Sequence, residues 1–249
     1  MNVSNVTFDG NKQAVKNDGK LNVSGKTEFK DSVSGSGVMN VAGNGTEVTI
    51  DRSDDNSDTK ISNTVKVEKP AKLVMKDGTA GIVNNEGTVQ FDGGKISTLN
   101  NDGTVDINAV YKGTLNNNAG GKVSVDTAEH LGSSVTNNGM LEVENGGALT
   151  KGMSGNGTLQ IDKATKVTGN KVEQGKIVVK ADADLLVGGD AQGIASANTT
   201  VLNGRTLEVK NESKNDLSNV SNYATGTTTF EKIVLKDNVI EKGYIEFSK

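Results

Sequence analysis

Short segments with alternating apolar and polar residues recur along the chain. Examples are KLNV at 20–23, TVQF at 88–91, TVDI at 104–107, KVSV at 122–125 and TLEV at 206–209. Their enrichment in β-branched residues and their two-residue period are typical of strands with one buried face. Apolar spacing of the helical kind is absent, so the pattern predicts an all-β chain.

A glycine stands before most of these strands at a nearly constant spacing. The repeated positions are Gly87, Gly103, Gly121, Gly139, Gly157 and Gly175. The first step is 16 residues and the later steps are 18. Helix-pair repeats of ~33 residues and propeller blades of ~40 are too long for this period. The repeat therefore predicts a parallel β-solenoid with coils of about 16–18 residues, in which Val, Ile and Leu stack inward from coil to coil.

Two regions depart from this period. Residues 51–64 read DRSDDNSDTKISNT and predict a polar loop insertion. Residues 199–249 have larger side chains and fewer glycines. Because the end of a solenoid exposes strand edges, such an end needs a cap. We therefore expect β-helix coils over 1–198, and terminal coils or a capping region of the same solenoid over 199–249.

Asparagine pairs come just before several of the repeated glycines. Asn and Gly tolerate the left-handed backbone conformations that a sharp corner can demand, and Asn amides at matching corners can form a hydrogen-bonded ladder. The feature is spread over several coils, which favours a structural corner over a single ligand site. The predicted corner residues are Asn84, Asn85, Gly87, Asn100, Asn101, Gly103, Asn116, Asn117, Asn137, Asn138, Gly139, Gly157 and Gly175.

The composition narrows the classes of function. Only 33% of the 249 residues are hydrophobic, which is the low range that favours disorder, but the net charge of −4 is small and the apolar residues are ordered into strands. The chain has no Cys, which excludes disulfides and thiolate chemistry. Arg occurs only as Arg52 and Arg205 and no basic stripe is present, so we expect no nucleic-acid partner.

Few residues offer chemistry. His130 is the only histidine, no G-x-S-x-G motif accompanies it, and we expect a turn residue. Glu86 and Asp102 occupy matching positions in NNEG and NNDG, so stacked coils would bring them to about 5 Å, near the separation that glycosidases use. We interpret both as solvated turn residues. We expect no catalytic residues and no cofactor.

One acidic run is a candidate binding loop. Its carboxylates are Asp51, Asp54, Asp55 and Asp58. Ca²⁺ takes six to eight oxygen ligands, but the run lacks both the D-x-D-x-D-G spacing and the final Glu of an EF-hand loop. We expect a solvated loop and no metal site.

Residues 154–179, SGNGTLQIDKATKVTGNKVEQGKIVV, resemble the passenger-associated transport repeat of type V autotransporters. The frame consists of Gly155 and Gly157-Thr158-Leu159, then Gly169-Asn170, then Gly175-Lys176-Ile177. The remaining coils resemble the passenger stalks of these proteins more loosely. The resemblance implies a right-handed parallel β-helix that is carried across the outer membrane and displayed on a Gram-negative cell.

The same resemblance implies adhesion, aggregation or toxin action, which are virulence roles. The chain lacks the family's signal peptide and membrane β-barrel, so we expect a passenger fragment, secreted or held at the outer membrane through the missing barrel. The expected function is an adhesin or adhesive stalk that binds a host-cell surface protein, a glycan or a copy of itself. The alternatives are a β-solenoid polysaccharide lyase or glycosidase, and a toxin or phage-fibre segment.

Overall fold

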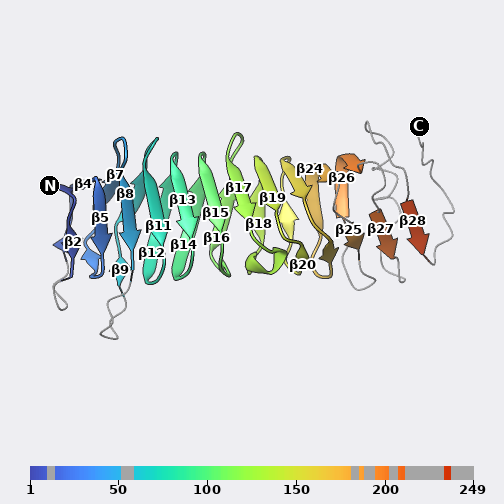
Figure 1. Cartoon of the computed structure of the whole chain (residues 1–249), viewed down its shortest axis with the longest axis horizontal. Helices are drawn as coiled ribbons and strands as arrows, with labels where there is room; N and C mark the ends of the chain where they lie inside the picture. The colour runs from blue at the N-terminus through green and yellow to red at the C-terminus, as the bar shows by residue number, and fades with distance from the viewer. Residues whose placement is uncertain are drawn as a thin grey trace. The chain divides into compact units, whose positions relative to one another are not determined.

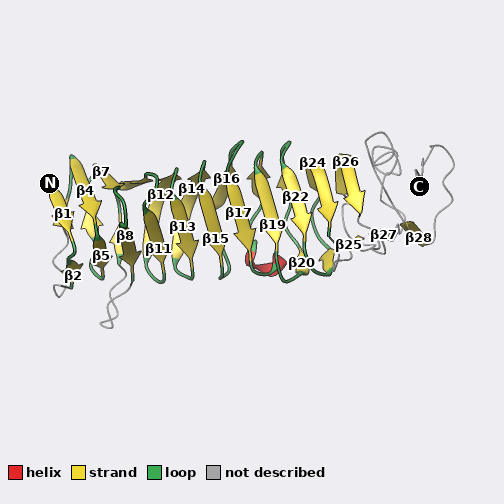
Figure 2. Cartoon of the chain, turned by 45° about the horizontal axis from the view of Figure 1, so that its top comes forward, coloured by secondary structure: helices red, strands yellow, loops and turns green. Residues whose placement is uncertain are grey.

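The chain folds as a right-handed parallel β-helix, which confirms the predicted fold class (Figure 1). The computed structural model describes residues 1–9, 15–51, 59–180, 185–187, 194–201, 207–210 and 233–236. In that part of the chain the single helical segment is the short 3₁₀ turn η1 (Ala128–His130), drawn red in Figure 2. No helix there has the length and apolarity needed to cross a membrane. The chain divides into two compact units, Met1–Val123 and Ser124–Lys249.

The first unit contains three ladders of parallel strands. The first ladder is β1 (Asn2–Ser4), β4 (Lys20–Ser24), β7 (Val38–Val41), β10 (Thr64–Val67), the second halves of β12 (Thr79–Asn85) and β14 (Lys95–Asn101), and β16 (Thr114–Asn117). The second ladder is β2 (Thr7–Phe8), β5 (Lys26–Phe29), β8 (Glu47–Ile50), β11 (Lys72–Met75), β13 (Thr88–Phe91) and β15 (Thr104–Ile107). The third ladder is β3 (Val15–Lys16), β6 (Val33–Ser34), β9 (Lys60–Ile61) and the first halves of β12 and β14. The strand β17 (Lys122–Val125) lies at the boundary between the units.

The second unit repeats the same plan. One ladder is β18 (Val135–Asn137), β21 (Met153–Ser154) and the first halves of β24 (Val172–Val179) and β26 (Ile194–Val201). Another is β19 (Met140–Val143), β22 (Thr158–Ile161) and the second halves of β24 and β26. The third is β20 (Gly147–Leu149), β23 (Thr165–Val167), β25 (Leu185–Val187), β27 (Leu207–Lys210) and β28 (Ile233–Lys236). Within 199–249, β27 and β28 thus extend a ladder, and most of that range lies outside the described residues.

Inward-facing apolar residues stack in columns and form the core. The parallel register places each one above its counterpart one coil away, about 4.8 Å along the axis. One column, with every member fully buried, is Leu21, Met39, Val65, Val83, Leu99 and Leu115. The rings of Phe8 and Phe29 stack with their centroids 4.7 Å apart, and Tyr111 meets Phe91 edge-on at 5.1 Å.

The coil length varies more than the sequence period indicates. Paired residues are 16 positions apart between Thr88 and Thr104 and 18 apart between Leu141 and Leu159, as predicted, but Thr27 and Val48 are 21 apart. The loop expected over residues 51–64 is shorter on its C-terminal side, because β9 belongs to the third ladder and Ile61 is fully buried. Residues 52–58 lie outside the described part of the chain.

Candidate functional site

Buried asparagines join successive coils through their side chains. Asn85, Asn101 and Asn117 end β12, β14 and β16, and all three are at most 1% exposed. Nδ2 of Asn85 donates to Oδ1 of Asn101 at 2.8 Å, and Nδ2 of Asn101 donates to Oδ1 of Asn117 at the same distance. In the second unit, Nδ2 of Asn137 donates to Oε1 of Gln174 at 2.6 Å. Each of these Nδ2 groups thus donates to an acceptor inside the coils, as a buried polar column requires.

The partner asparagines form a second ladder on the outer side of the same strands. Nδ2 of Asn100 donates to Oδ1 of Asn84 at 2.8 Å, and Nδ2 of Asn116 donates to Oδ1 of Asn100 at 2.9 Å. In the second unit, Oδ1 of Asn138 accepts a hydrogen bond from the backbone N–H of Asn156 at 3.0 Å. The Asn pairs therefore lie at or next to strand ends, and none of them lines the hollow described below.

The predicted left-handed backbone at these corners is wrong. Among the described residues other than glycine, only Asn5 has a positive φ, and the paired asparagines occupy strand ends. The repeated glycines are needed for a different reason, since a Cβ on Gly103 would lie 2.2 Å from the carbonyl oxygen of Gly87. Glycine is required where backbones approach this closely. A Cβ on Gly157 would lie 2.4 Å from the carbonyl oxygen of Gly139, and a Cβ on Gly175 would lie 2.4 Å from that of Asn156.

Unequal corner lengths create a notch in the first unit. The corners Glu86–Gly87 and Asp102–Gly103 have two residues each, between β12 and β13 and between β14 and β15. The corners on either side, 68–71 and 118–121, have four residues each. The two short corners leave an open hollow of about 370 Å³ between the longer ones. We call this hollow the notch; it is lined by Lys69, Pro70, Glu86, Gly87, Thr88, Asp102, Gly103, Thr104, Gly120 and Lys122.

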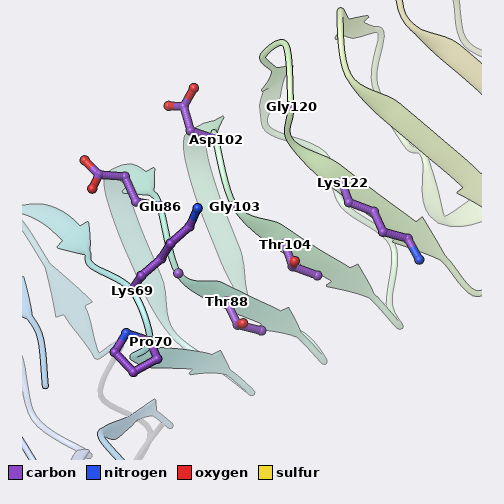
Figure 3. A pocket seen from close by; sticks show the side chains of 10 residues that line it. Lys69, Pro70, Glu86, Thr88, Asp102, Gly103, Thr104, Gly120 and Lys122 are labelled. Carbon is purple, nitrogen blue, oxygen red and sulfur yellow. The ribbon is translucent and has the colours of Figure 1, made fainter. Parts of the chain in front are cut away.

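The polar side chains of the notch come from matching positions on successive coils. Figure 3 shows Glu86 and Asp102 projecting from neighbouring corners, with Thr88 and Thr104 on the strands that follow. The backbone N–H of Thr104 donates to the carbonyl of Gly87 at 2.9 Å, which fixes the two coils in register. The lining of the notch therefore includes two threonines, two acidic residues and two lysines, Lys69 and Lys122.

The carboxylates of the notch have partners within the coil stack. An oxygen of Glu86 lies 3.4 Å from Nζ of Lys66, and Oδ1 of Asp102 accepts a hydrogen bond from Asn118 at 3.1 Å. Glu86 and Asp102 are thus charged corner residues, and each is held by a neighbouring side chain. In the described ranges, no three His, Cys, Asp or Glu side chains gather closely enough to hold a metal ion.

A second acidic cluster, in the second unit, was not predicted from the sequence. Nε2 of Gln160 donates to Glu142 at 2.5 Å and to Asp162 at 2.9 Å. Nζ of Lys180 lies 3.7 Å from Glu142 and 3.5 Å from Asp162. Burial and the neighbouring Glu142 carboxyl raise the pKa of Asp162 above its usual value, and Gln160 and Lys180 offset this only in part. Protonated Asp162 is therefore favoured in the folded chain more than in the unfolded chain.

The other sequence candidates lie apart from the notch. His130 lies in η1 with its side chain 20% exposed, and its Nδ1 is 4.0 Å from Oδ2 of Asp126. Asp51 lies at the start of the predicted acidic loop, 3.8 Å from Nζ of Lys76. The other three carboxylates of that loop, Asp54, Asp55 and Asp58, are outside the described residues.

The inner Asn ladder predicts a large loss of stability for Asn101→Ala. Asn101 donates to Asn117, Gly103 and Lys122, and accepts from Asn85 and from the backbone of Gly103. Removing it leaves several buried groups unpaired, at about 1–3 kcal/mol each, so we expect a loss of about 3 kcal/mol or more in the free energy of unfolding. Asn100→Ala removes the outer neighbour and should cost less than about 1 kcal/mol. Urea titrations of both variants measure this, and equal losses would contradict the buried ladder.

The raised pKa of Asp162 predicts a pH-dependent gain for Asp162→Asn. The folded state binds the proton of the Asp162 carboxyl more tightly than the unfolded state does. The stabilisation that this proton gives wild type is therefore present at acid pH and is lost as the pH rises through the folded pKa. The variant should therefore be more stable than wild type at pH 7, by less than about 1 kcal/mol, and equal to it below about pH 4. Asp106→Asn, an outward residue of β15, controls for the change in net charge. Thermal unfolding from about pH 3 to 8 tests this, and a variant less stable at pH 7 would refute it.

Comparisons with known proteins add no family. No protein-family model matches the chain, and neither a curated protein nor a solved structure matches it. The likeness to autotransporter passengers therefore depends on the residues of 154–179 and on the coil repeat.

Proposed function

We propose that this chain is a passenger-domain segment of a bacterial surface-exposed autotransporter, and that it acts as an adhesin or adhesive stalk. The observation that carries this proposal is the parallel β-helix itself, with its continuous columns of buried side chains and its polar outer strands. The segment that resembles the transport repeat supplies regular coils, because Leu159 and Ile161 of β22 pair with Ile177 and Val179 of β24.

The physics of the coils supports display on a cell surface. Each coil bonds to its neighbours, as when the N–H of Lys176 donates to the carbonyl of Gly157 at 3.0 Å. Stability in such a repeat is a sum of neighbour interactions, and folding can propagate from one coil to the next. A chain that emerges gradually through an outer membrane can fold in this way without waiting for distant segments.

The outer faces support contact with a partner. Ladder strands present Thr, Asn, Lys and Glu outward, as in the paired positions Lys60 and Thr79 or Glu47 and Lys72. Repeated polar groups give weak individual contacts that add when many copies engage one surface. The proposed partners are a host-cell surface protein, a glycan, or a second copy of the chain at the cell surface.

A polysaccharide lyase or glycosidase is the second candidate. The observation in its favour is the pair Glu86 and Asp102, which project from successive corners beside the notch. The acid pair would have to act on the glycosidic bond between sugar units. Release of reducing ends or unsaturated sugars from polysaccharides by the purified chain would support this candidate over the adhesive one.

The adhesive function predicts that cells gain attachment when they display this chain. The chain is fused to a heterologous outer-membrane anchor, and attachment to host-cell monolayers and settling of the culture are measured. We expect attachment or settling several-fold above that of cells carrying an unrelated β-helix of equal length, because repeated weak contacts add. Attachment and settling both equal to the control would contradict an adhesive role for this segment.

A further inference from the structure

The geometry of the notch assigns it a ligand: we propose that it binds a neutral saccharide unit through hydrogen bonds to its hydroxyl groups. This inference rests on the adhesive function proposed above and names the chemical class that one site of the chain recognises. The principal contacts would come from Thr88 and Thr104, with Glu86 and Asp102 beside them.

The two threonine hydroxyls are available for a ligand. Neither Thr88 nor Thr104 makes a side-chain hydrogen bond to the residues that the structure describes. The buried threonines of other coils differ, since Thr27 donates to the carbonyl of Ser24 and Thr46 to that of Ala42. Thr88 and Thr104 pair in register on β13 and β15, so their side chains repeat at about the coil spacing of 4.8 Å.

The two short corners make the threonine hydroxyls accessible. The corners at 86–87 and 102–103 are two residues shorter than the flanking corners, which rise on either side through Lys69, Pro70 and Gly120. Because each short corner lacks two residues that the flanking corners have, a recess is left beside the hydroxyls of Thr88 and Thr104. The recess arises from the two 16-residue steps of the repeat.

The charges of the notch favour an uncharged, hydroxyl-rich ligand. Its charged side chains are two carboxylates and two ammonium groups, so they carry no net charge that would select an ion. A carboxylate accepts hydrogen bonds, an ammonium donates them, and a threonine hydroxyl does both. A sugar hydroxyl also donates and accepts, so each type of group in the notch can bond to it.

The size and openness of the notch set a weak affinity. A volume of about 370 Å³ is at the lower end of the range for small-molecule sites. Because the lining contains no aromatic ring on which a sugar could stack, we expect a Kd on the order of 1 mM. Many displayed copies would raise the effective affinity for a surface that carries many sugar units.

The test titrates the purified chain with the neutral disaccharides lactose, maltose and N,N′-diacetylchitobiose, followed by NMR chemical-shift changes. Glucuronic acid and glucosamine serve as charged comparisons. We expect at least one neutral disaccharide to bind in the mM range and to bind about tenfold more weakly to the double variant Thr88→Val, Thr104→Val. Valine keeps the shape and suits a strand, so this variant should fold like wild type, as its thermal midpoint would show.

The matched control is the double variant Thr98→Val, Thr114→Val, which removes an equivalent register pair outside the notch. Its affinity should equal that of wild type. A second variant, Glu86→Gln, should weaken binding several-fold, since the amide nitrogen cannot accept a hydrogen bond. Equal loss in both threonine variants, preference for either charged sugar, or no binding of any neutral disaccharide would overturn the inference.

The outcomes separate this inference from the adhesive function. Cells that attach or settle while no neutral disaccharide binds the notch would leave the adhesive function standing and remove the saccharide site. Binding of a neutral disaccharide without any attachment or settling would leave the saccharide site standing and remove the adhesive function.

Discussion

The backbone hydrogen bonds between parallel coils are the interaction on which the rest of this structure depends. Examples are the N–H of Thr88 to the carbonyl of Ala71 at 3.0 Å and the N–H of Thr104 to that of Gly87 at 2.9 Å. They fix each residue directly above its counterpart in the previous coil. Each inward or outward side chain therefore has its counterpart in the next coil at a distance of about 4.8 Å. A residue is therefore favourable at a given position only if its side chain can pack against the side chain at the same position of the neighbouring coil.

This constraint explains why such different residues form columns. Leu99 and Leu115 stack because apolar side chains gain from mutual burial, and Asn101 and Asn117 stack because one amide donates to the next. A lone buried Asn would leave polar groups unpaired, whereas a column of them leaves such groups at its ends. Oδ1 of Asn85, whose counterpart in the preceding coil is Val67, is a buried atom without a partner. The same register brings Thr88 beside Thr104 and so turns two short corners into one notch.

The sequence was informative where residues interact with their own equivalents. The alternation in TVQF and TVDI predicted β13 and β15, and the Asn pairs predicted hydrogen bonds from coil to coil. The step of 16 residues showed that two residues were missing from a coil. It could not show that they were missing from a corner, because that depends on which residues pair. The role of the glycines was misjudged, since the contact between Gly103 and the carbonyl of Gly87 involves backbone atoms that no residue pattern displays.

The sequence repeat could not predict contacts between residues that occupy different positions in their coils. Glu142 and Asp162 are 20 residues apart, which does not match the 18-residue step between Glu142 and Gln160. They meet through Gln160 and Lys180 across neighbouring outward positions, so a comparison of equivalent residues could not find them.

Cysteine cross-linking tests the coil register most directly, since the chain has no cysteine of its own. Thr98 and Thr114 are register partners on β14 and β16, and two paired positions one coil apart are within disulfide reach. The pair Thr98→Cys, Thr114→Cys should therefore form an intramolecular disulfide under mild oxidation. The offset pair Thr98→Cys, Asn116→Cys should not, because diagonal neighbours are about 7–8 Å apart. Equal cross-linking of both pairs, or of the offset pair alone, would contradict the stacking on which the columns and the notch depend.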